Sequence, residues 1–122
     1  MNADKIGDIH LDFGETITSI SLGEYHSSAI TSTGRVFTWG SNNKGQLGDG
    51  TKNGRYIPTD ITSWFNLGEG ERVIKVSLGY SHSSAITSLG RTFTWGWNDD
   101  GQLGDSTTID QSKPKEITTR FN

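Results

Sequence analysis

The sequence predicts an all-β protein, and three observations support this fold class. First, the 122 residues include 16 Gly and 2 Pro together with many Ser and Thr, a composition that favours short strands joined by tight turns. Second, the chain has no Cys, so neither disulfides nor thiolate zinc sites can hold it together, and packing must do so. Third, one 56-residue segment occurs twice in tandem, which is typical of solenoids and propellers.

The charge pattern excludes several classes of partner. A net charge of −3 at pH 7 gives no basic surface for nucleic acid or for an anionic membrane. The first 15 residues carry charges from the start, at positions 4, 5 and 8 among others, and lack the apolar run of a signal peptide. No stretch approaches the roughly 18 consecutive apolar residues of a membrane span. We therefore expect a soluble protein with no signal peptide in this chain, no nucleic-acid partner and no membrane partner.

The tandem repeat defines three segments. The block that begins at Ser21 recurs from Ser77, and the same offset extends over residues 11–66 and 67–122, with about half of the aligned positions identical. We call two residues 56 positions apart repeat mates. Residues 1–10 form an N-terminal segment or a partial strand of an earlier copy. The second copy ends with the chain itself, as expected of an excised or engineered unit.

Each copy begins with a strand and continues into a hairpin. Alternation over 17–22 and 73–78 predicts a half-buried strand that places Ile74, Val76 and Leu78 on one face. The next two runs, His-Ser-Ser-Ala-Ile-Thr and Arg-x-Phe-Thr-Trp-Gly, are separated by a Ser-x-Gly turn and form the hairpin. In its second arm the aromatic residues project to one face and small residues to the other. Such a sheet can stack on a copy of itself.

A fourth strand completes each copy. It is expected to follow Pro58 or Pro114 and to end near Phe65 or Phe121. Because Pro is tolerated at the edge of a sheet and not at its centre, this strand is peripheral. Four antiparallel strands in about 56 residues make a blade of a β-propeller, so the sequence predicts two such blades per chain.

The motif order resembles the regulator of chromosome condensation repeat over residues 17–117. Both copies carry Gly-x-x-His-Ser, Trp-Gly and Gly-Gln-Leu-Gly in register, followed by Pro. The resemblance implies a propeller, commonly seven-bladed, that serves as a rigid protein-interaction platform. In the founding member, nucleotide exchange on a small GTPase uses an inserted β-wedge, which this chain lacks. A plant member senses ultraviolet light through Gly-Trp-Arg-His-Thr motifs, whereas this chain has Gly-Glu-Tyr-His-Ser from Gly23 and Gly-Tyr-Ser-His-Ser from Gly79, so that photochemistry is not expected here.

Two blades alone leave two large faces uncovered. A blade buries both faces against neighbours, so the chain is a piece of a longer repeat protein, closes a ring with other copies, or is unstable alone. We favour a homo-oligomeric ring, because heterologous contacts that close produce cyclic assemblies. Intact two-blade chains give only even totals, which predicts a trimer with six blades or a tetramer with eight.

The histidine, aromatic and leucine residues that recur in both copies are interpreted as structural. His26 and His82 precede Ser-Ser, so they could be metal ligands or His–Ser nucleophilic pairs. Such a pair also needs a third group that orients it and is normally built once, whereas these His residues recur. We therefore expect hydrogen-bonding struts and no catalytic, metal or cofactor site. The residues assigned to contacts between blades are Trp39, Trp95, Phe37, Phe93, His26, His82, Leu47 and Leu103.

Two loop motifs resemble ligand sites and are rejected. Residues 98–101 resemble part of a calcium loop, but Gly96 and Thr107 stand where an EF-hand needs acidic ligands. The Gly-Gln-Leu-Gly loops at 45–48 and 101–104 lack the Lys and the following helix of a phosphate-binding loop.

Four aromatic residues are the candidate contacts for a partner. Trp97 and Trp64 have the repeat mates Ser41 and Arg120, so the repeat does not require a Trp at either position. Tyr25 and Tyr80 lie in the two variable positions that follow the Gly after the first strand, near a rim of the sheet. The sequence thus favours a non-enzymatic structural or protein-interaction scaffold that binds itself and another protein. Two alternatives stay open: an enzyme assembled from groups of different chains, and a fragment of a guanine-nucleotide-exchange or adaptor propeller that binds a protein on one ring face.

Overall fold

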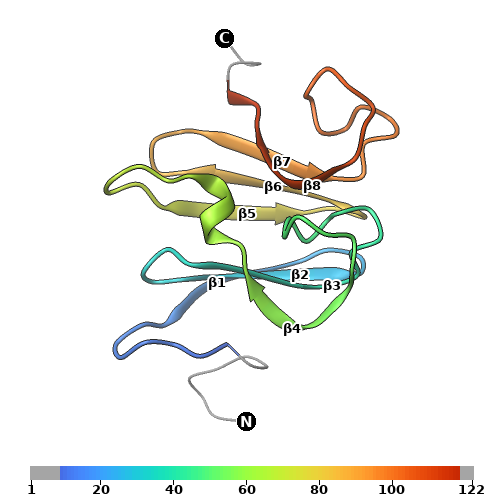
Figure 1. Ribbon diagram of the computed structural model, residues 1–122. Coiled ribbons are helices and arrows are strands. Elements are labelled where there is room, and N and C mark those ends of the chain that lie inside the picture. Colours follow the sequence, from blue (N-terminus) through green and yellow to red (C-terminus); the bar gives the residue numbers. More distant parts are fainter. Residues whose placement is uncertain (1–8, 119–122) are drawn as a thin grey trace.

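The computed structural model describes residues 9–118 and consists of two four-stranded antiparallel sheets, one stacked on the other (Figure 1). The first sheet has the order β1-β2-β3-β4 and comprises β1 (Ile17–Leu22), β2 (His26–Thr31), β3 (Val36–Gly40) and β4 (Arg55–Asp60). The 3₁₀ helix η1 (Thr62–Phe65) leads to the second sheet, which comprises β5 (Val73–Leu78), β6 (His82–Thr87), β7 (Thr92–Gly96) and β8 (Gln111–Glu116). The predicted all-β class and four-stranded blades are confirmed. Within this part of the chain no helix is long and apolar enough to cross a membrane.

The first strand of each sheet has the predicted bounds, but one predicted side-chain orientation is wrong. Val76 is buried and Leu78 is half-buried, whereas Ile74 is 49% exposed. The register of β5 against β6 shifts between Val73 and Lys75. Because a bulge adds a residue to one strand, it reverses the alternation on its far side. Val73 is therefore buried in place of Ile74.

The fourth strand lies at the sheet edge, as predicted, but its bounds differ from the prediction. Pro58 and Pro114 lie inside β4 and β8 rather than before them. Since each of these strands pairs with a single neighbour, a missing N–H can face away from the ladder. Phe65 belongs to η1, after the strand has ended, and Phe121 lies outside the described residues.

The main core lies between the two sheets. It joins residues of both halves: Ile30, Val36, Ile61, Phe65, Val73, Val76, Ala85, Phe93 and Trp95. Phe93 and Trp95 on β7 face the first sheet, where Val36 of β3 occupies the opposing surface. Phe65 contacts both aromatic rings edge-on, with centroid distances of 5.1 Å to Phe93 and 5.7 Å to Trp95. The aromatic face of one sheet thus packs on the small-residue face of the other.

A second, smaller core covers the outward face of the first sheet. It contains Ile9, Ala29 and Phe37, with Leu11, Ile17 and Trp39 packed around them. Ile9 and Leu11 are the repeat mates of Phe65 and Leu67, which pack in the main core. Residues 9–11 therefore occupy, against the first sheet, the place that the connection between the sheets occupies against the second.

The long loop between β3 and β4 is held by one buried amide. The Nδ2 group of Asn42 donates to the backbone carbonyls of Thr51 and Asn53, both at 2.9 Å, and to Asp49 at 3.1 Å. Its Oδ1 accepts from the backbone N–H of Leu47 at 2.9 Å. Asn98 makes the equivalent bonds in the second sheet. These bonds fix the loops at one end of the stack.

Truncation of Phe65 tests the core between the sheets. Phe65→Ala removes a fully buried ring that touches two other aromatic rings. We expect a loss of roughly 3–5 kcal/mol in the free energy of unfolding, measured by urea denaturation. Phe13→Ala, at a fully exposed ring, is the control and should change stability little. Equal effects of the two substitutions would contradict this assignment of the core.

Candidate functional site

A buried cluster of polar groups crosses the junction between the sheets. Ser83 on β6 donates from Oγ to the backbone carbonyl of Gln46 at 2.8 Å. Trp95 donates from Nε1 to the same carbonyl at 2.9 Å. The Nε2 atom of His26 on β2 lies 3.0 Å from Oγ of Ser83. We call His26, Gln46, Ser83 and Trp95 the junction cluster; each is at most 2% exposed.

The direction of each hydrogen bond shows which group of the His26–Ser83 pair is the donor. Because the hydroxyl proton of Ser83 is directed at the Gln46 carbonyl, the bond between the pair requires Nε2–H of His26 as the donor. The lone pair of the imidazole is then on Nδ1, which has no hydrogen-bond partner among the described residues. A nucleophilic pair needs the opposite arrangement, with the base accepting the hydroxyl proton and a third group orienting it. In this arrangement the bonds of His26 and Ser83 join the two sheets.

Burial also keeps His26 neutral. Desolvation lowers its pKa to about 4; a backbone hydrogen bond with His82 opposes this lowering, and the Coulombic effect of His82 adds a smaller lowering. A neutral imidazole supplies the single Nε2–H that the junction cluster uses.

One glycine allows the indole of Trp95 to approach the loop. Gly48 has φ 74°, and a Cβ there would lie 2.8 Å from Nε1 of Trp95. Any side chain at this position would be strained by the backbone and would displace the indole from the Gln46 carbonyl.

The structure distributes the residues assigned to blade contacts over three places. Four lie at the junction between the sheets or in its loop: Trp95, Phe93, His26 and Leu47. Phe37 and Trp39 lie on the outward face of the first sheet. His82 and Leu103, the repeat mates of His26 and Leu47, lie on the side of the second sheet that no other described sheet covers.

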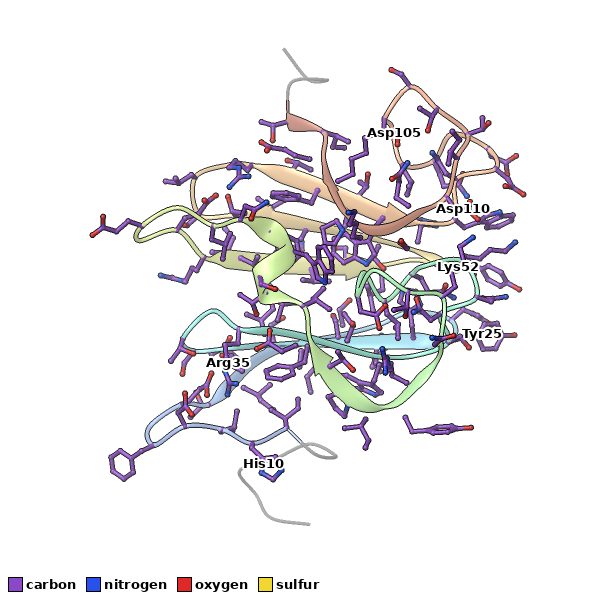
Figure 2. The ribbon with its side chains drawn as sticks, in the orientation of Figure 1. His10, Tyr25, Arg35, Lys52, Asp105 and Asp110 are labelled. Atoms are coloured by element: carbon purple, nitrogen blue, oxygen red, sulfur yellow. The ribbon has the colours of Figure 1, made fainter. Side chains whose placement is uncertain are left out.

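A pocket of about 500 Å³ lies at the loop end of the stack and is lined by both halves of the chain. Tyr25 comes from the β1–β2 turn and Tyr80 from the equivalent β5–β6 turn, while Trp97 follows β7. Lys44 and Lys52 come from the β3–β4 loop. Tyr25 and Lys52 project at the same end of the molecule (Figure 2). We call these five residues the rim pocket.

The aromatic walls of the rim pocket touch one another. Tyr25 and Tyr80 meet edge-on, with ring centroids 5.9 Å apart, and Tyr80 lies 6.3 Å from Trp97. The ammonium group of Lys44 lies 5.8 Å from the centroid of Trp97. Three of the four aromatic residues that the sequence marked as partner contacts are therefore brought together.

The fourth residue, Trp64, lies elsewhere. It is on η1, 38% exposed, and Lys113 lies 5.2 Å above its ring. A Cβ at Gly50 would lie 2.9 Å from the same indole. Trp64 is thus packed against the β3–β4 loop and the second sheet, and it does not line the rim pocket.

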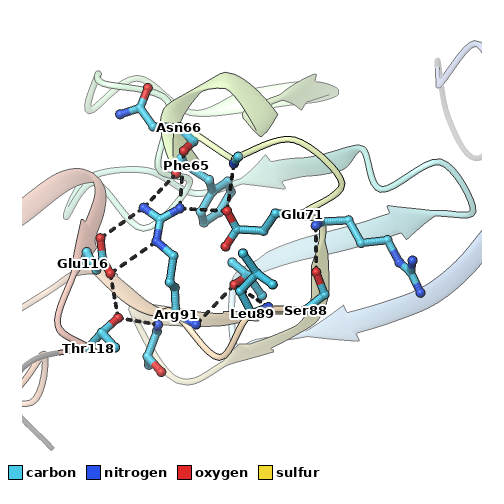
Figure 3. A network of polar contacts seen from close by, with 12 residues as sticks. Phe65, Asn66, Glu71, Ser88, Leu89, Arg91, Glu116 and Thr118 are labelled. Carbon is cyan, nitrogen blue, oxygen red and sulfur yellow. Dashed lines mark hydrogen bonds and ion pairs between the residues drawn. The ribbon is translucent and has the colours of Figure 1, made fainter. Parts of the chain in front are cut away.

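Sequence reasoning missed a second polar network, centred on Arg91 (Figure 3). Its guanidinium pairs with Glu71 at 2.9 Å and with Glu116 at 3.0 Å, and it donates to the carbonyls of Phe65 and Asn66. The pKa of Glu71 is lowered by the backbone N–H of Gly68 and also by Arg91. The network ties the connection between the sheets to the edge strand β8.

The same clamp occurs in the first half. Arg35 pairs with the fully buried carboxylate of Glu15 at 2.6 Å and donates to the carbonyl of His10. The hydrogen bond from the Arg35 guanidinium to the Glu15 carboxylate holds the pKa of Glu15 well below its usual range. Glu15 and Glu71 are repeat mates, as are Arg35 and Arg91. The identity of both pairs across the two copies was the signal that could have identified them.

Comparison with known families gives a consistent result over most of the chain. A family model described as "Regulator of chromosome condensation (RCC1) repeat" matches residues 33–86 and 90–121. A second model with the same description matches residues 17–46 and 73–102.

Known proteins with similar sequences or structures are much longer than this chain. The mitochondrial RCC1 domain-containing protein RUG3 of Arabidopsis thaliana is 35% identical over 101 residues, which cover 83% of this chain and 22% of that protein. Human WBSCR16 superimposes with a TM-score of 0.77 at 28% identity, covering 89% of this chain and 28% of that structure. Yeast RCC1 (Prp20), in a crystal structure with Kap60 bound, gives a TM-score of 0.69 at 28% identity, covering 84% of this chain and 25% of that chain. The chain spans less than a third of each.

The low pKa of His26 predicts a pH dependence of stability. The folded-state pKa of about 4 lies below the ordinary value of 6.5, so the unfolded chain binds more protons between these pH values. The contribution of His26 is complete above about pH 6.5 and is lost as pH falls towards 4, on the order of 3 kcal/mol in all. Urea denaturation at half-unit pH steps measures this slope.

The control distinguishes His26 from other titrating groups. His26→Gln should flatten the slope between pH 5 and 6.5, whereas His10→Gln, at an exposed position, should leave it unchanged. An identical slope in the His26→Gln variant would show that other groups cause it.

Proposed function

Because the chain belongs to the regulator of chromosome condensation (RCC1) repeat family, we propose that it is a two-blade propeller unit that stacks head to tail on copies of itself. In this proposal the chain acts as a non-enzymatic structural and protein-interaction scaffold. The observation that supports it is the junction cluster, since each half of that cluster recurs on an outward face of the chain.

The second sheet presents one half of a further junction. His82 is the repeat mate of His26, and Gln102 is the repeat mate of Gln46, whose carbonyl accepts two bonds at the junction. At Gly48 a Cβ would collide with Trp95, whereas at its mate Gly104 the nearest atom, from Ile117, would be 3.9 Å away. The space that the indole fills at the junction is therefore open on the outward face.

The first sheet presents the complementary half. Ser27 and Trp39 are the repeat mates of Ser83 and Trp95. Ser27 pairs with Trp39 across β2 and β3, as Ser83 pairs with Trp95 across β6 and β7. Neither Ser27 Oγ nor Trp39 Nε1 forms a side-chain hydrogen bond within residues 9–118. In the assembly, the Gln102 carbonyl of one copy accepts from both groups of the next copy.

Exposed apolar residues support coverage of both faces. On the first sheet Ile20 is 49% exposed and Leu22 is 70% exposed, while their mates Val76 and Leu78 are packed at the junction. On the second sheet Ile86 is 42% exposed, while its mate Ile30 is buried. At about 25 cal/mol per Å², apolar surface of this kind favours burial by another blade.

The number of blades follows from the repeat. A heterologous contact that closes on itself gives a ring, and two blades per chain permit six blades in a trimer or eight in a tetramer. A fragment of an exchange-factor or adaptor propeller is the alternative, in which blades of a longer polypeptide cover the same two faces. Binding of a further protein is part of the proposal, and it is supported by the structure of the yeast relative with Kap60.

The mass in solution tests self-assembly. We expect native mass spectrometry and light scattering to give three or four times 13.3 kDa. Trp39→Arg places a charge in the open face without touching the internal junction, so it should give a folded monomer. Circular dichroism and urea denaturation check that this variant is folded.

Phe13→Arg is the matched control, because it adds the same charge at a fully exposed ring. It should assemble like the parent chain. A parent chain that is monomeric at millimolar concentration, or a Trp39→Arg variant that still assembles, would refute head-to-tail stacking.

A further inference from the structure

We infer that the rim pocket binds an acidic segment of a partner protein, with its carboxylates on Lys44 and Lys52 and an apolar side chain against Tyr80 and Trp97. This site lies within one chain. It adds a binding activity to the assembly proposed above and does not depend on it.

The first argument is that the repeat does not require the aromatic walls. The repeat mates of Tyr25, Tyr80 and Trp97 are small or charged: Ser81, Glu24 and Ser41. The polar residues that hold the blades together recur: the four residue types of the junction cluster are identical at the mate positions, and Arg91 and Glu71 have the identical mates Arg35 and Glu15. Three large aromatic residues at non-recurring positions nevertheless converge on one pocket. Convergence of this kind indicates a surface selected for contact.

The second argument is exposure. Tyr25 is 58% exposed and Tyr80 is 56% exposed, so both rings present apolar area to solvent. Tyr and Trp are the residue types in which binding energy concentrates at protein interfaces. The Nε1 donor of Trp97 is shielded from solvent and has no acceptor among the described residues. Within the described residues no hydrogen bond from Nε1 fixes this indole; the ring of Tyr80 and the ammonium group of Lys44 contact it.

The third argument is charge. The pocket lining includes Lys44 and Lys52 and no acidic side chain, in a chain whose net charge is −3. Neither lysine forms a salt bridge within the described residues, whereas Arg55, in an adjoining hollow with Tyr25, is paired with Asp49. The repeat mates of the two lysines are Asp100 and Thr108. Like the aromatic walls, the two positive charges therefore occur in one copy and are not part of the repeat. Two unpaired cations beside an aromatic wall are complementary to a carboxylate next to an apolar residue.

The size and the overall charge favour a peptide over a nucleic acid. A volume of about 500 Å³ accommodates a few side chains. Nucleic-acid binding depends on many phosphate contacts and on a strongly basic surface, and this acidic chain offers two lysines at the site. The occupant we propose is therefore a short acidic stretch of protein that carries an apolar anchor.

Fluorescence anisotropy tests the inference with a defined probe. The probe is a fluorescein-labelled acidic peptide, Gly-Ser-Asp-Glu-Phe-Asp-Glu-Gly-Ser. The control probe, the amide peptide, carries Asn in place of each Asp and Gln in place of each Glu. We expect saturable binding of the acidic peptide, weaker binding of the amide peptide by about tenfold, and weakening as salt is raised.

The sister repeat supplies substitutions that the fold already accepts. Trp97→Ser and Lys44→Asp introduce the residues found at the mate positions Ser41 and Asp100. Each should weaken binding of the acidic peptide by about tenfold or more with unchanged circular dichroism. Lys75→Ser, which introduces the residue of the mate Ser19, removes an exposed cation outside the pocket and should bind like the parent.

The outcomes separate this inference from self-assembly. The Trp39→Arg variant should bind the acidic peptide as the parent chain does, whatever the mass of either protein. Equal binding of the acidic and amide peptides, or equal effects of Lys44→Asp and Lys75→Ser, would overturn the proposed site. Tighter binding of a twelve-residue oligothymidylate than of the acidic peptide would overturn it in favour of a general polyanion surface.

Discussion

The packing of an aromatic sheet face on a small-residue sheet face is the constraint on which the rest of this structure depends. Phe93 and Trp95 fill the space that Val36 and its neighbours leave, and Phe65 closes the side of this core. Close packing of that kind tolerates neither gaps nor extra atoms, and so the loop must carry Gly48 where the indole approaches. The connection between the sheets, the clamp of Arg91 and the amide hub of each long loop all serve to hold this contact in one geometry.

Polar groups determine the register of that contact. Apolar surfaces attract one another without direction, whereas a buried donor or acceptor must meet its partner or lose the free energy of hydration. The Gln46 carbonyl accepts from Ser83 and Trp95, and His26 completes the set with its single Nε2–H. A sliding of one sheet over the other would break all three bonds. The neutral form of His26, enforced by burial, is therefore part of the specificity of stacking.

The comparison of the two copies separates scaffold from surface. Residues that recur, such as Glu15 with Glu71 and Arg35 with Arg91, form the internal clamps of each half. Residues that differ between the copies lie mainly in turns and loops, where a rigid scaffold permits variation, and in the edge strands. The rim pocket is assembled from such positions. In this chain a pocket thus forms where adjacent blades bring their variable turns together, without any change in the stacking residues.

The sequence by itself determined the all-β class, the two tandem units, the hairpin strands, the edge position of the fourth strand and the family, because periodicity and a 56-residue identity pattern are local or repeated signals. It did not determine that Val73 is buried in place of Ile74. A bulge reverses the alternation of buried and exposed side chains, and the sequence pattern that marks a bulge is weaker than the alternation that marks a strand. Nor did it show that Tyr25, Tyr80 and Trp97 converge while Trp64 lies apart. Proximity between turns of different sheets is set by how the sheets stack, and that depends on side-chain volumes and hydrogen bonds at the junction. Only the tertiary structure contains this information.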